Sequence, residues 1–265
     1  MKRLFVLALV SILSASCLAQ QHPGVEEFAA RAAEEHDLDP AEITALLEDA
    51  RFKQSIVDAM TRPAEGKPWH KYRPIFITDK RIDGGVDFWR ENEQLIAQAS
   101  EQFSVDPEVI VAIIGVETFY GRITGGYRVL DALTTLSFYY PDTGNDRSDF
   151  FSKELMNFLL LGSEENLPLL EVEGSYAGAM GLGQFMPSSY REYAVDLDGD
   201  GRRDLWTSLA DVIGSVANYL HRHGWQPGQP VTSRAQVAEG ANMDIVSRRN
   251  LKPAKTVAEL AQEGF

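Results

Sequence analysis

The chain has 265 residues, of which 44% are hydrophobic and 24% are charged, which is the composition of a globular protein that buries a core. Its formal net charge of −14 excludes a nucleic-acid surface, because neutralising phosphates needs clustered Lys and Arg. The same charge argues against electrostatic adhesion to anionic lipid, but it leaves carbohydrate binding open, since sugars are held mainly by hydrogen bonds and ring stacking.

Residues 1–19 have the pattern of a secretory signal peptide. Two basic residues precede the apolar run Leu4 to Leu13, and small residues lead to a cleavage site after Ala19. The apolar run is too short for a membrane-spanning helix. Cys17 is the only cysteine, so no internal disulfide forms, and lipid attachment to Cys17 is the alternative to plain cleavage. We therefore expect an exported protein.

Helical spacing of apolar residues recurs along the rest of the chain. It predicts helices over Val25–His36, Pro40–Met60, Val86–Phe103, Val109–Tyr120, Leu130–Phe138, Phe150–Leu161 and Asp211–His223, and the start of another at Met186–Ser189. Asp106 and Pro107 predict an N-cap carboxylate and a first-turn proline before Val109, and Gly121 offers a stop after Tyr120.

The segments rich in proline and glycine interrupt this pattern. Arg62–Asp79 also carries aromatic residues and is predicted to be an ordered loop or extended segment. Gly224–Pro230 is predicted to be a loop, with weak strands or a short helix beyond it. The fold class that follows is mainly α (α+β), built around a single core.

Glu117 is the first candidate for chemistry, because it lies in the apolar helix predicted over Val109–Tyr120. A carboxylate in such a helix is costly unless it is paired, protonated or used. We expect desolvation by apolar neighbours and the negative helix end near Gly121 to raise its pKa. A carboxylic acid that stays protonated near neutral pH can donate a proton to a glycosidic oxygen. The alternative is a structural Glu bonded to the backbone or to Arg122.

A glycine-rich segment, Gly174–Tyr190, is the second candidate. Four glycines in ten residues permit close approach of the backbone to a ligand. The segment lacks the Lys and the spacing of a phosphate-binding loop. Ser175 and Gln184 offer a hydroxyl and an amide as partners for sugar hydroxyls. The alternative is a tight turn for helix packing, which glycines also serve.

The third candidate is an acidic loop whose first part matches an EF-hand calcium loop. Its acids at loop positions 1, 3, 5 and 9 are Asp196, Asp198, Asp200 and Asp204. Position 12 is Thr207 rather than Glu, so Asp211 is the candidate for the last acid, and Arg202 offers its backbone carbonyl. Oxygen ligands favour calcium over zinc, in a structural role. A solvated acidic turn is the alternative.

Three blocks, in this order, resemble the B-type lytic murein transglycosylases: Gly115–Arg122, Gly174–Tyr190 and, after the acidic loop, Ser215–Leu220. The resemblance runs from about Tyr72 to Pro227. It implies a lysozyme-like domain with additional N-terminal helices, in which one glutamate serves as both acid and base. Glu117 would protonate the MurNAc-β-1,4-GlcNAc oxygen of peptidoglycan and then accept the proton of the sugar's 6-hydroxyl, which gives a 1,6-anhydromuramoyl product. The lack of an obvious second catalytic carboxylate fits this mechanism.

The resemblance also implies the residues that hold the substrate and the metal. The expected substrate-binding residues are Ser175, Gln184, Tyr219, Tyr72 and Arg147. The expected ligands of a structural Ca²⁺ are Asp196, Asp198, Asp200, Arg202 and Asp211, and no cofactor is expected for catalysis. Arg147 is what remains of paired arginines that relatives carry after a Tyr-Pro step. Relatives continue beyond the position of Phe265 into a segment whose tyrosines help wall the cleft, so we expect this cleft to lack that part or to be shaped differently.

The expected organisation is a signal peptide over 1–19, a transglycosylase domain over 20–230 and a C-terminal extension over 231–265. We expect a monomer in the periplasm that acts on peptidoglycan glycan strands, with a lipid on Cys17 as the alternative anchor to the outer membrane. Three other functions stay open at this point: a hydrolytic lysozyme that uses water, a non-catalytic peptidoglycan-binding protein and a calcium-dependent adhesion module.

Overall fold

The computed structural model describes residues 21–62, 66–245 and 253–265. The predicted signal peptide and Cys17 lie outside the described residues. The chain forms two compact units that divide between Gln226 and Pro227. The boundary expected after residue 230 was drawn on composition and stays a prediction.

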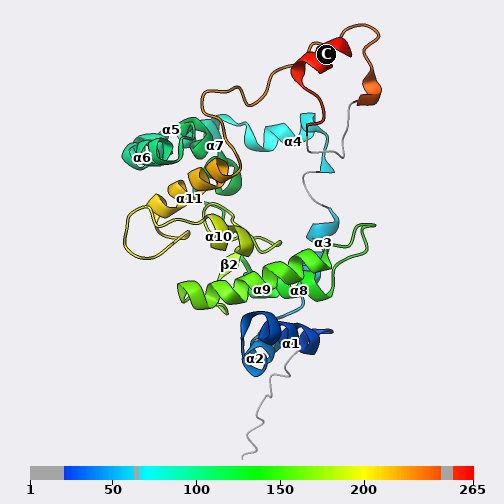
Figure 1. The fold of residues 1–265 in the computed structure, drawn as a ribbon, viewed down its shortest axis with the longest axis vertical. Coiled ribbons are helices and arrows are strands. Elements are labelled where there is room, and N and C mark those ends of the chain that lie inside the picture. The colour runs from blue at the N-terminus through cyan, green and yellow to red at the C-terminus, as the bar shows by residue number, and fades with distance from the viewer. Residues whose placement is uncertain (1–20, 63–65, 246–252) are drawn as a thin grey trace, which may run out of the picture. The chain divides into compact units, whose positions relative to one another are not determined.

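The first unit is built almost entirely of helices (Figure 1). Its helices are α1 (Val25–His36), α2 (Pro40–Asp49), α3 (Gln54–Thr61), α4 (Trp69–Phe76), α5 (Asp79–Glu91), α6 (Glu93–Phe103), α7 (Pro107–Thr118), α8 (Val129–Phe138), α9 (Ser148–Glu165), α10 (Pro187–Tyr193) and α11 (Leu209–Arg222). Two short strands, β1 (Tyr127–Arg128) and β2 (Glu173–Gly174), pair antiparallel with Tyr127 opposite Gly174. This composition confirms the predicted mainly α fold class.

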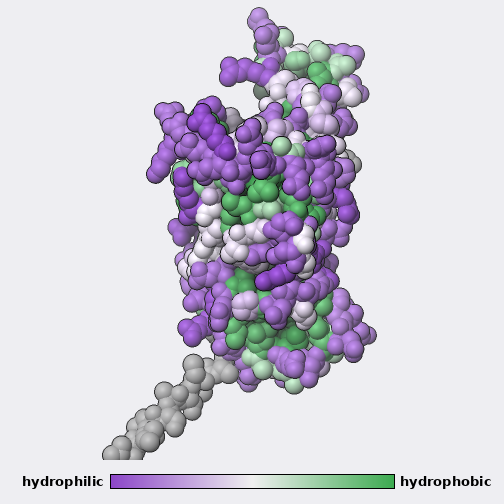
Figure 2. Space-filling view, turned by 90° about the vertical axis from the view of Figure 1, so that its left-hand side faces the viewer, coloured by the Kyte–Doolittle hydropathy of each residue, from purple (hydrophilic) through white to green (hydrophobic). Residues whose placement is uncertain are grey.

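The core lies where α8 and α9 pack together and where α11 packs against α6, α7 and α10. Its fully buried side chains include Leu130, Leu133, Leu136, Leu155, Phe158 and Ile114. α5 packs on α7, and α1 packs on α2. Hydrophilic residues cover most of the face shown in Figure 2, with apolar patches between them. In the described part of the chain, no helix is both long enough and apolar enough to cross a membrane.

Two predicted helices are each divided in the structure. Pro40–Met60 breaks into α2 and α3, because the backbone N–H of Arg51 bonds to Asp131 and that of Lys53 bonds to Thr135 instead of continuing a helix. Val86–Phe103 forms the end of α5 and all of α6, with buried Asn92 at the break donating from its side chain to the Phe88 carbonyl. Tertiary hydrogen bonds therefore override the apolar spacing at the first break, and a local side-chain hydrogen bond accompanies the second.

The prediction of a loop over Arg62–Asp79 was wrong, because α4 occupies its middle with Pro74 inside the helix. The helix is tolerated because none of its residues is buried, so water can satisfy the carbonyl that a proline leaves unbonded. Trp69, Tyr72 and Phe76 lie along one side of α4, with ring centroids 6.3 Å and 5.1 Å apart.

The second unit is small and is stabilised by its own contacts. It contains a short 3-10 helix, η2 (Met243–Ile245), and α12 (Val257–Gln262), so the short helix expected beyond residue 230 is present. Thr256 and Glu259 form a capping box at the start of α12. Backbone hydrogen bonds join Ala238 to Gly264 and Asn242 to Glu263.

Candidate active site

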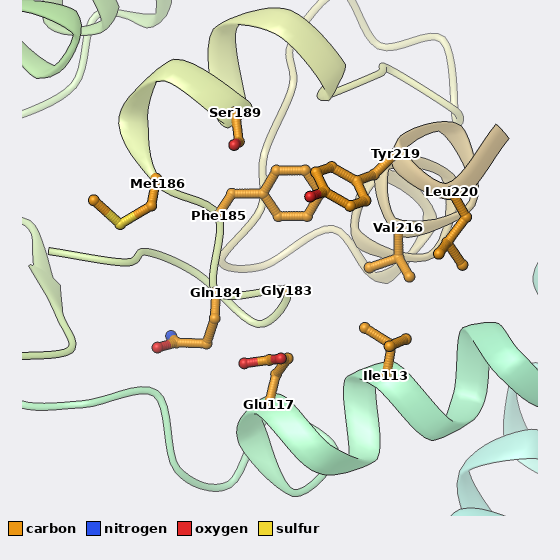
Figure 3. A pocket seen from close by; sticks show the side chains of 10 residues that line it. All are labelled: Ile113, Glu117, Gly183, Gln184, Phe185, Met186, Ser189, Val216, Tyr219 and Leu220. Carbon is orange, nitrogen blue, oxygen red and sulfur yellow. The ribbon is translucent and has the colours of Figure 1, made fainter. Parts of the chain in front are cut away.

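Glu117 lies in the last turn of α7 and borders a cavity of about 250 Å³ (Figure 3). The cavity lies between α7, the glycine-rich segment, the start of α10 and α11, and it is lined by Ile113, Glu117, Gly183, Gln184, Phe185, Met186, Ser189, Val216, Tyr219 and Leu220. Glu117 is the one carboxylate among these lining residues. A single acid therefore borders a cavity whose other lining side chains are apolar or carry an amide or hydroxyl group.

The surroundings of Glu117 differ from those expected from the helix pattern. The side chain is exposed rather than enclosed by apolar residues, because Ile110, Ile114 and Thr118 form the buried side of α7. Arg122, the alternative structural partner, places its guanidinium 4.9 Å from the centre of the Phe119 ring. Because Glu117 is in the final turn, it lies at the negative end of the helix dipole, as the sequence predicted.

The end of α7 is fixed on one side by Thr118. Its hydroxyl is buried, donates to the carbonyl of Leu182 at 2.8 Å and accepts from the backbone of Gly121 at 3.0 Å. Phe119, Tyr120 and Gly121 all have left-handed φ angles, so the chain turns sharply after Glu117. The helix end that was expected at Gly121 is therefore a turn of three residues after Thr118, and Thr118 bonds this turn to the glycine-rich segment.

On its other side, the end of α7 is fixed by α5. The ring of Tyr120 fits against Gly85 and Gly115, where an added Cβ would lie 3.2 Å and 2.6 Å from its Cζ atom. Its hydroxyl donates to the carbonyl of Arg81 at 3.0 Å. Burial raises the pKa of Tyr120, although the charges of Arg81 and Arg122 lower it in part.

Arg81 holds the carbonyls of the last turn of α7. Its Nη1 donates to the carbonyl of Gly115 at 2.6 Å, two residues before Glu117. The guanidinium lies 5.3 Å from the centre of the Phe76 ring and 4.8 Å from that of Phe119, which is within the range of cation–π contact. One cation therefore links α4, α5 and the end of α7.

The glycine-rich segment uses most of its glycines for packing. A Cβ on Gly178 would meet the side chain of Leu133, and one on Gly181 would meet the backbone of Leu205. Gly183 is the glycine that lines the cavity. Ser175 does not line it, because its hydroxyl accepts from Ala177 and Ala179 within its own turn. The packing interpretation thus applies to most of this segment.

Gln184 and Tyr219 are the two predicted substrate-binding residues that the structure brings together with Glu117. Gln184 has a left-handed φ of 51° and donates from Nε2 to the carbonyls of Thr124 and Gly181, which leaves its Oε1 for a ligand. The Tyr219 ring is 37% exposed and stacks on His223, with ring centroids 4.1 Å apart. In Figure 3 the side chains of Glu117 and Gln184 lie close together.

The other predicted contacts lie outside this cavity. Tyr72 lies between Trp69 and Phe76 on α4 with its ring tilted against both, and Arg147 packs its guanidinium on the rings of Phe150 and Phe151. Sequence reasoning missed the apolar lining residues Ile113, Val216 and Leu220. Their positions, one turn before Glu117 and within one turn of Tyr219, were the available signal.

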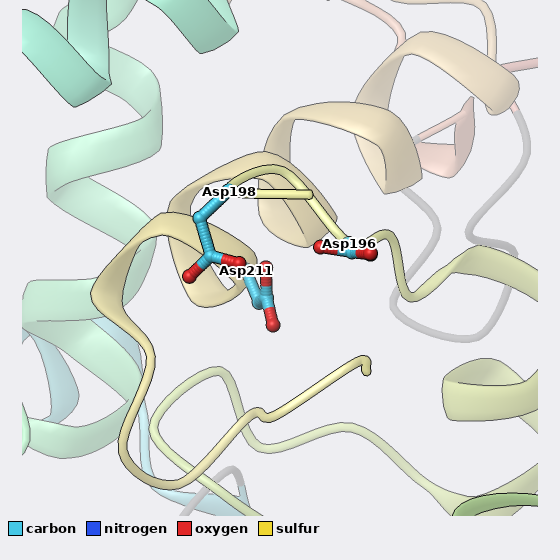
Figure 4. A group of neighbouring side chains, drawn as sticks. All are labelled: Asp196, Asp198 and Asp211. Carbon is cyan, nitrogen blue, oxygen red and sulfur yellow. The ribbon is translucent and has the colours of Figure 1, made fainter. Parts of the chain in front are cut away.

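The acidic loop brings three of its predicted ligands together (Figure 4). Oxygen atoms of Asp196, Asp198 and Asp211 lie within 4.8 Å of one another. Asp211 is fully buried in the first turn of α11 and accepts from the backbones of Leu197 and Asp204, both at 2.8 Å. Burial raises the pKa of Asp211; these backbone bonds lower it, and the charges of Asp198 and Asp196 raise it.

The remaining residues of the acidic loop shape its turn. Asp196 accepts from the backbones of Gly199, Asp200 and Gly201, and these bonds outweigh desolvation and lower its pKa. The Asp200 carboxylate accepts from the backbone of Arg202, and it is not part of the group of three. Three close carboxylates on a turn of this form fit a hard cation with oxygen ligands. Asp106 is the N-cap residue of α7 and Pro107 lies in its first turn, as predicted, but the Asp106 carboxylate accepts from the indole of Trp225 and does not cap the helix backbone.

Comparison with known proteins places the chain in a family. The family model described as Transglycosylase SLT domain matches residues 20–265. The chain is 41% identical over 255 residues to the membrane-bound lytic murein transglycosylase B of Escherichia coli K12, which covers 92% of this chain and 68% of that protein. The crystal structure of soluble lytic transglycosylase SltB1 from Pseudomonas aeruginosa is 48% identical, with a TM-score of 0.80 over 91% of this chain and 80% of that one.

Two further solved relatives contain ligands. Escherichia coli Slt35, solved in complex with calcium, is 44% identical with a TM-score of 0.72, over 80% of this chain and 66% of that one. Pseudomonas aeruginosa SltB3, solved with NAG-NAM-pentapeptide, is 30% identical with a TM-score of 0.68, over 78% and 54%. These similarities confirm the expected lysozyme-like fold. The chain therefore belongs to the transglycosylase SLT domain family, as a B-type lytic murein transglycosylase that cleaves peptidoglycan.

Proposed function

We propose that Glu117 is the catalytic acid and base, and that the bond cleaved is MurNAc-β-1,4-GlcNAc. The observation that supports this role is its place as the one carboxylate lining the cavity, at the end of α7. Glu117 donates its proton to the glycosidic oxygen as the bond from that oxygen to the muramoyl C1 breaks. The carboxylate then takes the proton of the 6-hydroxyl, whose oxygen bonds to C1. No water is consumed, the product is a 1,6-anhydromuramoyl end, and Glu117 is protonated again.

Gln184 and Tyr219 hold the sugar next to Glu117 in this proposal. The Oε1 of Gln184 accepts from a sugar hydroxyl or N–H group, and the exposed Tyr219 ring offers a face for a sugar ring. Ile113 and Val216 line the same cavity and keep water away from C1, which favours the internal hydroxyl over hydrolysis. Ser175 holds the turn up to Ala179 in the glycine-rich segment, the segment that also carries Gln184. Tyr72 and Arg147 are proposed to contact the glycan strand beyond this cavity.

The test is the substitution Glu117→Gln, assayed on purified sacculi. Loss of a general acid should lower kcat by about 10²–10⁴-fold. Glu108→Gln is the matched control, because Glu108 is an exposed acid in the first turn of the same helix. Unchanged lysis by the Glu117 variant would refute its role. Products that carry only reducing ends would instead indicate a lysozyme, and binding of sacculi without lysis by the wild type would indicate a binding protein.

We also propose a structural Ca²⁺ in the acidic loop, held by Asp196, Asp198, Asp200, the Arg202 carbonyl and Asp211. The close approach of three carboxylates supports it, since their mutual repulsion is relieved by a divalent cation. A relative was solved in complex with calcium. The ion would link the loop to the first turn of α11, and α11 carries Tyr219.

The protein is proposed to act as a monomer on peptidoglycan strands in the periplasm, with either a free mature N-terminus or a lipid anchor on Cys17 in the outer membrane. The apolar run that precedes Cys17 and the membrane-bound relative support export and attachment. Incorporation of labelled fatty acid into the wild type but not into Cys17→Ala would establish the anchor. Absence of label from both would leave the free form.

A further inference from the structure

A second cavity, of about 390 Å³, lies beside strand β1 in the first unit. Its lining contains three basic and two acidic side chains, although the chain as a whole is strongly acidic. The lining residues are Arg51, Lys53, Ser55, Gly126, Tyr127, Arg128, Asp131 and Glu173. None of them has a role in the mechanism proposed above.

The base of this cavity is a rigid ion pair. Asp131 is 3% exposed and accepts from Arg128 through Nε at 3.1 Å and Nη2 at 2.6 Å. Arg128 also bonds to the carboxylate of Asp49 at 2.6 Å and to its carbonyl at 2.9 Å. The charges of Arg128 and Asp131 are therefore used within the protein, and they fix the shape of the cavity rather than attract a ligand.

Arg51 and Lys53 are the other two cations among the lining residues of the cavity. Their backbones are fixed to α8, since the N–H of Arg51 bonds to Asp131 at 2.9 Å and that of Lys53 bonds to Thr135 at 3.2 Å. The Arg51 side chain is exposed. The ammonium of Lys53 forms an ion pair with the Asp131 carboxylate at 3.8 Å, without a hydrogen bond, and its side chain stays 40% exposed. The break between α2 and α3 thus holds two cations at one surface hollow.

This cavity adjoins the wall of the active-site cavity. Gln184, which lines the active site, donates to the carbonyl of Thr124. Gly126, which lines the second cavity, follows Thr124 by two residues, so their Cα atoms are at most about 7.6 Å apart. The Thr124–Gly126 backbone therefore connects the wall of the active-site cavity with the lining of the second cavity.

We propose that the second cavity binds a carboxylate of the peptide carried by the muramoyl residue. The proposal rests on the proposed function, because it requires a peptidoglycan strand next to Gln184. A peptide joined to the muramoyl group through its amino end carries carboxylates, whereas the glycan hydroxyls and acetamido groups are neutral. The guanidinium of Arg51 matches a carboxylate with two parallel hydrogen bonds, and Lys53 adds charge. Glu173, at the same cavity, suits an amino group of such a peptide.

The test compares two substrates: sacculi with their peptides, and glycan strands from which an amidase has removed the peptides. In the double variant Arg51→Gln/Lys53→Gln, KM for peptide-bearing strands should rise about 3–10-fold, because charge-assisted bonds are lost. KM for stripped strands should change less than twofold, because the lactyl carboxylate that the amidase exposes stays at the sugar ring and does not extend to the second cavity. Lys153→Gln is the control, since it removes an exposed cation on α9 that lines neither cavity.

An equal effect on both substrates, or no effect on either, overturns the proposal. Thermal unfolding of the double variant checks that the folded state is retained, and binding of a muropeptide to the wild type and the variant by calorimetry provides a readout that needs no cleavage. Arg51-dependent and Lys53-dependent muropeptide binding by an enzyme that releases no anhydro product would refute the proposed function and keep this site. Release of the anhydro product, with the double variant affected equally on peptide-bearing and stripped strands, would support the proposed function and refute this site.

Discussion

Substitution of Gly115 by Ala tests whether the end of α7 is fixed by the Tyr120 ring. Ala is favoured over Gly in a helix interior by about 1 kcal/mol, so the change should stabilise a helix that has free space. Here the new Cβ would lie 2.6 Å from Cζ and 2.7 Å from Cε1 of Tyr120. The ring cannot easily move away, because Gly85 and Phe88 of α5 lie against it and its hydroxyl bonds to Arg81.

The overlap should therefore outweigh the gain in helix propensity. Overpacking costs about 1–3 kcal/mol, and losing the Tyr120 hydrogen bond costs about 1 kcal/mol more, so Gly115→Ala should destabilise the protein by about 1–3 kcal/mol. The measurement is urea unfolding in a double-mutant cycle with Tyr120→Ala. With the ring removed, Gly115→Ala should become stabilising by about 1 kcal/mol. A single Gly115 variant as stable as the wild type, or no change of sign in the Tyr120→Ala background, would refute the reasoning.

Three other outcomes follow from the structure. Chelation should lower the melting temperature and added Ca²⁺ should raise it, since Ca²⁺ at 100 times its Kd would add about 2.7 kcal/mol to the free energy of unfolding. Asp198→Asn should weaken this response to Ca²⁺, whereas the control Asp142→Asn, in an exposed loop, should not. The hydrogen bond from Arg191 holds the pKa of Glu164 below its usual range, so Glu164→Gln should cost stability at neutral pH. The urea-measured difference from the wild type should shrink below the ordinary Glu pKa and vanish once pH falls through the lowered pKa of Glu164. Arg81→Met should lower kcat on sacculi more than it raises KM, with partial recovery in Arg81→Lys, because the carbonyls of α7 lose a donor.

Where apolar residues recur at helical spacing and a stop signal is present, the sequence was enough to find the helices. The helix predicted over Val25–His36 has the same bounds as α1, and Asp37 ends it with a left-handed C-cap conformation. The break after Asp49 could not be predicted, since it depends on Asp131 and Thr135, about 80 residues along the chain. The error at α4 has another cause: the proline rule assumes that a lost backbone bond is costly, and that cost is small on a helix with no buried residue.

The sequence predicted a site residue best where its side-chain type has few structural roles in that position, and worst where the same side chain also serves packing or turns. Glu117 drew attention as a carboxylate in an apolar helix, and it does border the cavity, although its side chain is exposed and the cost of burial on which the prediction relied does not apply. Ser175 was ambiguous, because a hydroxyl that suits a sugar also suits the backbone of its own turn, and it bonds there. Val216 and Leu220 could not be separated from the core by sequence, since the lining of a ligand cavity and a buried helix face share the same apolar composition.

The proposed single-carboxylate mechanism makes a demand on geometry that the contacts around α7 would meet. One carboxylate must reach the glycosidic oxygen and then the 6-hydroxyl of the same sugar, so its helix end must hold still while the sugar rearranges. The last turn of α7 is bonded through Thr118 to the glycine-rich segment and through Arg81 and Tyr120 to α5. The glycine-rich segment also carries Gln184, so acid and sugar partner move together. Loosening either attachment should therefore slow turnover while the anhydro product stays the same, whereas a change in product would mean that the attachments also exclude water.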